Sequence, residues 1–529
     1  MSDFLQFVCN GSEVGIDIRS GASLLEVLRE QLGLTSVKDG CAPQGQCGCC
    51  TVLVDGEPRV ACVTPATRVA DRSVTTIEGL DAQRRDEYAA SFAGAGGSQC
   101  GFCTPGIIMR FAGDRVRDTD RGLAAHLCRC TGWLTVRDAI AGVEAGPRDL
   151  AQAARRAEFE GGVRQDVGPD VALGHAPFAD DTAPRDALVA VPLPPGSNVA
   201  SVSAAGVEWV VGASLAEARA LASKVQGRRT TVATKPPLLD ALPACPDGGV
   251  QVATSWVEPA YLEPDASWCA PGGEPASPIA NGGAFGGKSS SAAPIAAREL
   301  ADRHGRVVRV VYSREDVVRL GPKRPPIAAT AVARDGVVEI DGVVAAGASA
   351  WPDALLIGDI EVRARWSERA IPGPPVSNEI RAAGLAECAL LAAGALGREL
   401  ETSVASGARA LATVEVDSGT IKRVVIQLAA GDPLDEIVLR SYAIGAAHMA
   451  LSWVLSEGLA VDPISGEVHD LTIRSFGVLK AAQTPAIDVE FIDTSGPALA
   501  RAGDAVFMAV ASSTWLALGC PVSLPLYAR

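Results

Sequence analysis

The sequence predicts an α+β protein of several domains, in which a small mixed domain and a helical domain precede a longer α/β region. The chain has 529 residues, of which 48% are hydrophobic, and this length is too great for one small core. Ten of its fourteen cysteines lie before residue 131, so the N-terminal part differs in chemistry from the rest. After residue 168, strand-like runs alternate with alanine-rich helical runs, which is typical of mixed α/β structure.

Residues 1–77 predict a β-grasp domain. Two β-type runs within residues 4–18 are joined by Asn10-Gly11, a strong hairpin signal. A helix should follow, with Ser23 as its N-cap and Glu26 completing a capping box. A cysteine-rich loop and a further strand over residues 51–54 come next. Hairpin, helix, loop and strand is the order expected of a β-grasp domain.

The remaining domains are predicted from changes of pattern along the chain. Residues 78–146 are helical in pattern, and residues 147–168 are polar and rich in glycine, which predicts a linker. We expect a small α/β domain over residues 169–270 and a longer α/β domain over residues 271–529.

Charge excludes some classes of partner. The formal net charge is −15 and the isoelectric point is near 5.0, which disfavours nucleic acid and anionic membranes as main partners. The N-terminus lacks a basic region followed by a long apolar run, and no uncharged apolar stretch reaches eighteen residues. We therefore expect a cytoplasmic protein without a membrane span.

The first cysteine group predicts a plant-type [2Fe-2S] site, which uses a glycine-rich loop near C-x4-C-x2-C and a distant fourth cysteine. Cys47 and Cys50 have the required two-residue gap, whereas Cys41 lies one residue further away than usual. The loop glycines let backbone N–H groups approach the sulfides. We predict ligation by Cys41, Cys47, Cys50 and Cys62, with Cys49 as a surplus thiol that does not bind iron.

The second group comprises Cys100, Cys103, Cys128 and Cys130. Pro105 suits the first turn of a helix, which would place Cys100 and Cys103 beside the positive helix N-terminus. Thiolates and an anionic cluster are stabilised there. The alternative is a set of buried or zinc-binding cysteines, with His126 as a possible further ligand. Two unlike groups of four in one short stretch favour iron–sulfur clusters over zinc.

At these motifs the sequence resembles a known family. Residues 99–106 and 127–132 resemble the iron–sulfur subunit or domain of the molybdenum hydroxylases, which include xanthine dehydrogenase, aldehyde oxidase and CO dehydrogenase. The resemblance implies a β-grasp domain and a four-helix domain, each with one cluster. It also implies that the second cluster faces molybdopterin, with Gln99 close to the pterin, and that the first faces a flavin. The interval from Cys103 to Cys128 is shorter than usual, so we expect a shortened helical hairpin.

A glycine-rich loop over residues 281–289 is the main motif of the longer region. Read literally it satisfies the P-loop pattern, but Pro275 and Pro278 stand where that motif requires a strand. It resembles instead the Gly-Gly-x-Phe-Gly-Gly-Lys loop of the family's molybdenum-binding subunit, and residues 379–384 resemble that subunit's arginine-glycine loop. The resemblance implies molybdopterin contacts from Gly282, Gly283, Phe285, Gly286, Gly287 and Arg381.

Departures from the family pattern predict a truncated, degenerate molybdopterin domain of the xanthine dehydrogenase type. The region is shorter than a molybdenum subunit and lacks its Gly-Gln-Gly loop. Asp504 stands where the family has a catalytic glutamate. A carboxylate one methylene shorter would be misplaced by about 1 Å, which can reduce the rate about a hundredfold. The alternative is that Asp504 is a solvated turn residue, and we assign no catalytic residue firmly.

These observations predict an electron-transfer and scaffold subunit of a heteromeric molybdenum hydroxylase. Molybdopterin would lie in one partner chain and FAD, or another acceptor, in a second. The alternative is a compact hydroxylase that binds molybdopterin through Gly282–Lys288 and Arg381, with Asp504 as base. A pure interaction protein with vestigial clusters is disfavoured because all eight cysteine ligands are intact.

Overall fold

The N-terminal domain is built on a five-stranded mixed sheet. The computed structural model describes residues 2–113, 118–143, 146–223, 232–279, 281–348 and 351–527. The first strands form the predicted hairpin, which turns at Asn10 and Gly11 with φ values of 50° and 80°. The sheet order is β2-β1-β5-β3-β4, with bounds β1 (Ser2–Cys9), β2 (Ser12–Arg19), β3 (Thr51–Val54), β4 (Glu57–Val60) and β5 (Ser73–Thr75).

A short helix follows the hairpin, as predicted. Ser23 caps helix α1 (Leu24–Glu26) by accepting a hydrogen bond from the Glu26 backbone N–H. Glu26 does not complete the predicted capping box, because its carboxylate pairs with Arg19 at 2.7 Å. The helix continues as a π-helical turn, η1 (Val27–Gln31), and its leucines and valines pack into the core of the sheet. Three short 3₁₀ turns complete the domain: η2 (Ala61–Val63), η3 (Ala66–Val69) and η4 (Ile77–Gly79). The order of elements is that of the predicted β-grasp domain.

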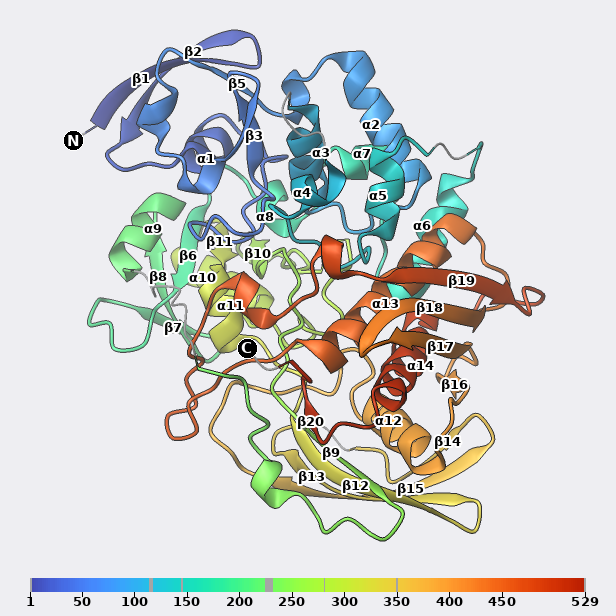
Figure 1. Ribbon diagram of the computed structural model, residues 1–529. Coiled ribbons are helices and arrows are strands. Elements are labelled where there is room, and N and C mark those ends of the chain that lie inside the picture. Colours follow the sequence, from blue (N-terminus) through green and yellow to red (C-terminus); the bar gives the residue numbers. More distant parts are fainter. Residues whose placement is uncertain are drawn as a thin grey trace.

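Helices make up the second domain, which packs beside the first at one end of the molecule (Figure 1). Pro105 occupies the first turn of its second helix, as predicted. The predicted short hairpin between Cys103 and Cys128 falls partly on residues 114–117, outside the described residues. The four helices are α2 (Ala82–Gly94), α3 (Thr104–Ala112), α4 (Thr119–Leu123) and α5 (Leu134–Ile140).

The predicted linker over residues 147–168 is wrong, because a helix occupies most of it. Helix α6 (Leu150–Gly161) begins at Asp149, whose carboxylate accepts hydrogen bonds from two backbone N–H groups of the first turn. Its small and charged residues pack against helix α13 (Glu436–Leu455). Two of its charged residues, Arg156 and Glu160, form a buried ion pair, whereas Arg155 and Glu158 are exposed.

The domain boundary predicted between residues 270 and 271 does not separate the sheets. Two short helices, α7 (Pro169–Ala172) and α8 (Ala179–Thr182), lead into a five-stranded sheet of order β10-β11-β6-β8-β7. That sheet extends past residue 270, because strand pairing joins segments distant in the chain. Its elements are β6 (Leu188–Pro192), β7 (Val202–Ala204), β8 (Val207–Gly212), α9 (Leu215–Ala222), β10 (Ala266–Cys269), α10 (Ala293–His304), β11 (Val308–Val311) and α11 (Arg314–Leu320).

A six-stranded sheet of order β14-β15-β13-β12-β9-β20 lies at the end of the molecule opposite the N-terminal domain (Figure 1). The 3₁₀ turn η5 (Leu239–Ala241) precedes strand β9 (Val250–Thr254), which pairs in this sheet although it precedes residue 270. The other strands are β12 (Ile327–Arg334), β13 (Val337–Ala345), β14 (Ala354–Ile357), β15 (Ile360–Arg369) and β20 (Ser523–Leu524).

The main hydrophobic core lies between this sheet and a four-stranded sheet of order β16-β17-β18-β19. Helix α13 passes through the core and is the one helix of the described residues long and apolar enough to span a membrane; 89% of its most apolar window is buried. The remaining elements are α12 (Leu385–Leu396), β16 (Thr402–Ser403), β17 (Arg409–Asp417), β18 (Thr420–Ala429), η6 (Ile473–Phe476), η7 (Ala481–Gln483), β19 (Ala486–Ile492) and α14 (Ala502–Ala517).

Candidate iron–sulfur and cofactor sites

The loop between η1 and β3 brings the first four predicted ligands together. Hydrogen bonds with the Cys47 and Cys62 thiols hold the pKa of Cys41 well below its usual range. The Cys62 thiol also interacts with Cys50. Backbone N–H groups of Gln46 and Cys47 donate to the Cys41 sulfur at 3.4 and 3.3 Å. Buried N–H donors aimed at sulfur are the environment that an anionic cluster requires.

Cys49, the surplus thiol of the sequence, lies on the edge of this group. Its side chain is 1% exposed, and its sulfur is 4.0 Å from the Cys47 carbonyl oxygen. It interacts electrostatically with ligands of both groups, including Cys128. Its thiol also interacts with that of Cys47, a predicted ligand, and the two ligand sets remain predictions.

The second four cysteines form two close pairs of thiols. The sulfurs of Cys100 and Cys130 are 3.5 Å apart. A hydrogen bond from the Cys103 thiol lowers the pKa of Cys128 to about 6, which favours the thiolate that binds metal. Cys103 is the N-cap of α3, so the pair lies at the positive end of that helix, as predicted.

Pairs of thiols suit a [2Fe-2S] cluster, in which two irons share four cysteines. A zinc ion would instead draw four ligands around one point. His126, the possible zinc ligand, is 2% exposed and has two ring nitrogens without a hydrogen-bond partner among the described residues. A Cβ atom on Gly48 would lie 2.4 Å from its Nδ1 atom, so the imidazole rests on the loop of the first group. Buried ring nitrogens without a hydrogen-bond partner, beside the loop of the first group, are consistent with a polar group bound at that loop.

The two groups of cysteines are separated by little more than one layer of backbone. The Leu127 N–H donates to the Cys47 carbonyl at 3.0 Å, which joins the two ligand loops directly. A Cβ atom on Gly106 would lie 2.4 Å from the Gly48 carbonyl oxygen, so the first loop rests against the start of α3. These contacts bring the two predicted ligand loops directly against each other.

The glycine loop from the C-terminal region covers the second group of cysteines. A Cβ atom on Gly283 would lie 3.2 Å from the Cys130 sulfur and 3.4 Å from the Cys100 sulfur. Asn281 donates to the Cys100 carbonyl at 3.3 Å. On another side, a Cβ atom on Gly445 of α13 would lie 1.8 Å from the Cys130 carbonyl oxygen. Glycine is therefore needed wherever these two elements close over the second cysteine group.

Sequence reasoning missed the buried charges that hold this arrangement. Arg129, between two predicted ligands, donates to the Pro259 carbonyl at 2.9 Å and forms an ion pair with Glu457. Lys288 of the glycine loop pairs with Glu263 at 2.8 Å. The position of Arg129 inside a Cys-x-Cys motif was the signal available in the sequence. Its partner, Glu457, lies more than 300 residues away and could not be identified from that motif.

Most of the predicted molybdopterin residues gather around one cavity of about 170 Å³. The glycine loop, helix α6 and the start of α14 surround it. The predicted residues on its wall are Gly282, Gly283, Phe285, Gly286, Arg381 and Asp504. The structure therefore brings together residues that are more than 200 positions apart in the chain.

Three charged residues of this cavity, Arg381, Arg501 and Asp504, interact with one another. Arg381 donates to Asp504 at 3.1 Å, and its guanidinium lies 4.9 Å from the centre of the Phe285 ring. Arg501 lies 3.7 Å from the second Asp504 oxygen. Asp504 is half-buried in the first turn of α14, so it is not the solvated turn residue of the alternative interpretation. It contacts Arg381 and also lines the cavity.

Two predicted cofactor residues lie away from that cavity. The Gln99 amide donates to the Cys130 carbonyl at 3.0 Å and to the Ser441 hydroxyl at 2.9 Å. Gly287 packs against Pro259 and Tyr261, each 2.7 Å from where its Cβ would be. Gln99 therefore joins the second cysteine group to α13, while Gly287 supports the fold of the loop.

Comparisons with known proteins agree with these sites. Residues 7–71 match the 2Fe-2S iron-sulfur cluster binding domain, and residues 76–141 match the [2Fe-2S] binding domain. The xanthine dehydrogenase iron-sulfur-binding subunit of Escherichia coli O157:H7 is 38% identical over 146 residues, which cover 26% of this chain and 91% of that subunit. The aldehyde oxidoreductase of Megalodesulfovibrio gigas is 42% identical over 142 residues, which cover 25% of this chain but only 16% of that enzyme.

The whole fold also has a solved counterpart. The structure of the aldehyde oxidoreductase from Desulfovibrio gigas aligns with a TM-score of 0.69 at 15% identity, over 97% of this chain and 97% of that chain. At this identity the likeness extends to the fold alone, but it covers the α/β region behind the cysteine domains. The chain belongs to the molybdenum hydroxylase family, with two N-terminal [2Fe-2S] domains followed by a region that has the fold of aldehyde oxidoreductase.

Proposed function

We propose that this chain is the electron-transfer and scaffold subunit of a heteromeric molybdenum hydroxylase. It receives electrons from a molybdopterin site in a partner chain and delivers them to a flavin or another acceptor. When bound, each [2Fe-2S] cluster supplies a place for one electron. The chain's own cysteines hold the two clusters, and the Leu127–Cys47 backbone contact sets their separation. We also propose a cytoplasmic location, as the sequence leads us to expect.

The pairing of Arg381 with Asp504 is the observation that carries this proposal. An arginine that binds a cofactor must present free N–H groups, and a catalytic base must face the substrate. Here the Arg381 Nη1 atom is engaged by one Asp504 oxygen at 3.1 Å, while its buried Nε–H has no hydrogen-bond partner among the described residues. The cavity of about 170 Å³ is also below the range of about 300–1,000 Å³ usual for organic ligands and cofactors. The small cavity and this ion pair support our proposal that molybdopterin lies in a partner chain.

A relative supports a partner chain. The Escherichia coli protein is named as an iron-sulfur-binding subunit, and this chain covers 91% of its length with its first 150 residues or so. The remaining α/β region then offers a surface on which a partner chain can dock. We assign that region the role of scaffold.

One observation favours a second candidate function. The likeness to the aldehyde oxidoreductase fold extends over 97% of the chain. A compact enzyme could bind molybdopterin through Gly282–Lys288 and Arg381, with Asp504 as base, if the Arg381–Asp504 pair opened. In that case the chain would need no catalytic partner.

Metal analysis of the purified chain separates these candidates. The scaffold proposal expects about four iron atoms per chain and no molybdenum. Stoichiometric molybdenum in a chain purified without partners would overturn it and support the compact enzyme. As a control, Cys103→Ser should reduce the iron content to about two atoms per chain. A colourless, iron-free preparation made under anaerobic conditions would contradict both candidates and point to an interaction protein.

A further inference from the structure

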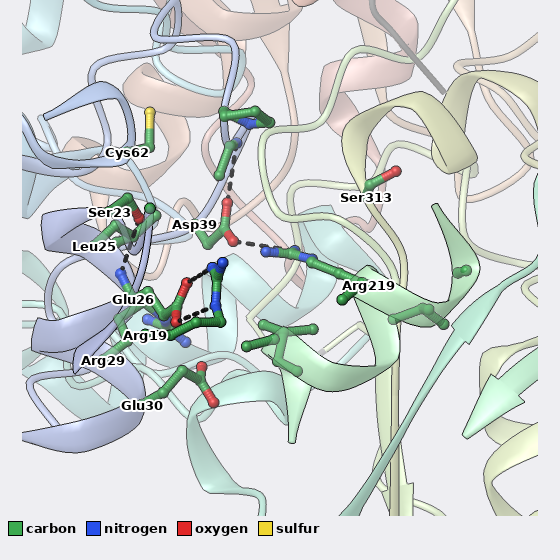
Figure 2. Close-up of a pocket in the computed structure, with 18 of the residues that line it drawn as sticks. Arg19, Ser23, Leu25, Glu26, Arg29, Glu30, Asp39, Cys62, Arg219 and Ser313 are labelled. Atoms are coloured by element: carbon green, nitrogen blue, oxygen red, sulfur yellow. Dashed lines mark hydrogen bonds and ion pairs between the residues drawn. The ribbon is translucent and has the colours of Figure 1, made fainter. Parts of the chain in front are cut away.

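A second cavity, of about 360 Å³, lies between the β-grasp domain and the small α/β domain. Figure 2 shows that Arg19, Glu26 and Asp39 reach it from one side and Arg219 from the other. It shares no wall residue with the cavity around Arg381. Its volume is within the range of about 300–1,000 Å³ that is usual for binding sites of small organic molecules.

The first cysteine group forms part of the wall of this cavity. Cys62 lines it directly, and so do Ala42 and Pro43, which follow Cys41. In Figure 2 the Cys62 sulfur points away from the other labelled side chains, and its thiol interacts with those of Cys41 and Cys50. A molecule in the cavity would therefore be separated from the first cluster only by the residues that hold it. The glycine loop, by contrast, covers the second cysteine group.

The walls combine apolar faces with a few charged groups. Leu25 on one side and Leu215 on the other are buried, and proline and alanine residues complete the apolar part of the lining. Arg19 is paired with Glu26 at 2.7 Å. Arg219 contacts Asp39 at 3.3 Å, and this is its one hydrogen bond among the described residues. Arg219 is 38% exposed, so its other N–H groups are available to a ligand.

Buried ion pairs fix the two sides of the cavity relative to each other. Arg29 of the β-grasp domain contacts Asp180 at 2.8 Å and Asp181 at 2.7 Å. Lys38, which is fully buried, contacts Asp181 at 2.5 Å. Breaking such buried pairs is strongly destabilising, so they hold this interface in one arrangement. The cavity is therefore preformed, as binding sites for small molecules usually are.

We propose that this cavity binds a small planar quinone as an electron acceptor for the first cluster. Apolar walls suit the ring, and the Arg219 guanidinium suits a ring carbonyl oxygen. Reduction of one quinone to the hydroquinone takes two electrons and two protons. The two clusters that the chain's cysteines would hold would supply these electrons, one from each when reduced, and water at the open cavity would supply the protons. The inference rests on the proposed function, because electrons must leave through the first cluster.

Binding can be tested on the oxidised chain with both clusters in place. Equilibrium dialysis with menadione should show one saturable site. Ala220→Trp, which projects a large ring from the cavity wall, should weaken binding about tenfold or more. Leu221→Trp adds the same ring at the next position of α9, which is exposed and does not line the cavity, and should leave binding unchanged. Arg219→Met is a second variant that should weaken binding without filling the space.

Equal weakening by Ala220→Trp and Leu221→Trp, or no saturable binding, would overturn the proposal. Binding of flavin mononucleotide in preference to menadione would assign the cavity to a different acceptor and would also overturn it.

Electron stoichiometry gives an independent readout. The chain is reduced with dithionite, freed of excess reductant under anaerobic conditions, and titrated with menadione. One menadione per chain should reoxidise both clusters, as followed by electron paramagnetic resonance, and Ala220→Trp should slow this reaction while Leu221→Trp should not. If both clusters form and reduce but menadione does not bind, this inference fails and the proposed function stands. If no clusters form, the proposed function itself fails.

Discussion

Cys49 and Cys50 are neighbours in the chain and equally buried, yet their predicted roles differ. Cys50 accepts a hydrogen bond on its sulfur from the Cys62 N–H at 3.4 Å, within the first cysteine group. Cys49 interacts with the Cys47 thiol and electrostatically with Cys128, so it lies between the two groups. Spacing alone leaves the choice open, because Cys47 is followed by thiols at both the second and third positions.

We predict that Cys49→Ala keeps about four iron atoms per chain, since no ligand is lost. Cys50→Ala, the matched variant, should lose the first cluster and keep about two. Iron analysis with electron paramagnetic resonance of the reduced chain distinguishes the two clusters. If Cys49→Ala loses the first cluster and Cys50→Ala keeps it, the assignment of ligands is reversed.

Glu263 provides a pH-dependent contribution to stability. Burial raises its pKa to about 7, although Lys288 opposes the shift from 2.8 Å away. The ordinary value is 4.5, so between these two values the folded chain holds a proton that the unfolded chain releases. The stability that this group contributes is fully present below about pH 4.5 and is lost as the pH rises through 7.

We predict a decrease in the free energy of unfolding of about 3 kcal/mol from this group over that pH window. Glu263→Gln can still accept a hydrogen bond from Lys288 but does not titrate, so its unfolding should depend less on pH. Urea unfolding of both chains at pH 5 and pH 8 measures the difference. Glu13→Gln, at an exposed position, should behave as the wild type does. Parallel pH profiles for wild type and Glu263→Gln would contradict the prediction.

At the scale of elements, the glycine loop is constrained by what it covers. Gly283 has a φ of 80°, and a Cβ atom there would press on the Cys130 sulfur. Gly272 has a φ of 67° but no atom within 4 Å of its Cβ position. The two positions therefore share the backbone requirement and differ only in the steric contact.

We predict that Gly283→Ala alters the electron paramagnetic resonance signal of the second cluster, whereas Gly272→Ala does not. Both variants should lose about 1 kcal/mol of stability, because a side chain is strained at positive φ. An unchanged signal in Gly283→Ala would show that the loop does not lie against the cluster.

Helix α6 depends on the hydrogen bonds made by its N-cap residue, Asp149. We predict that Asp149→Ala destabilises the protein by about 1 kcal/mol, because two N–H groups of the first turn lose their acceptor. Asp149→Ser, which keeps an acceptor, should recover most of the loss. Amide hydrogen exchange over residues 150–161 checks the effect directly. Rapid exchange of this segment in the wild type would support the original prediction of a linker.

At the scale of the whole molecule, local patterns predicted the features that are local in sequence. The Asn10-Gly11 hairpin, the Ser23 cap and the turn at Pro105 follow from a few adjacent residues, and the structure contains all three. The spacing of the cysteines likewise predicted that they form two groups in the folded chain. Helix α6 was not predicted, because the glycines and charged residues of this segment were interpreted as a linker despite the N-cap at Asp149. Two of those charged residues, Arg156 and Glu160, are paired in the interior.

Features that depend on distant partners could not be predicted. Strand β9 pairs with β12, more than 70 residues further on, so the division between sheets does not follow chain order. The Arg381–Asp504 pair joins residues 123 positions apart. The resemblance to a family suggested that both would face a cofactor, and only the three-dimensional arrangement shows that they face each other.

The closure of the second cysteine group has a consequence for how the protein is made. Its ligands are all present once residue 130 has been synthesised, but Gly283 and Gly445, which lie against them, come at least 150 residues later. Iron has open access to these cysteines only while the C-terminal region is still being synthesised or is unfolded. Loading of the second cluster is therefore tied to biosynthesis, and a chain that folds without iron is expected to take it up afterwards only at the rate at which that region opens.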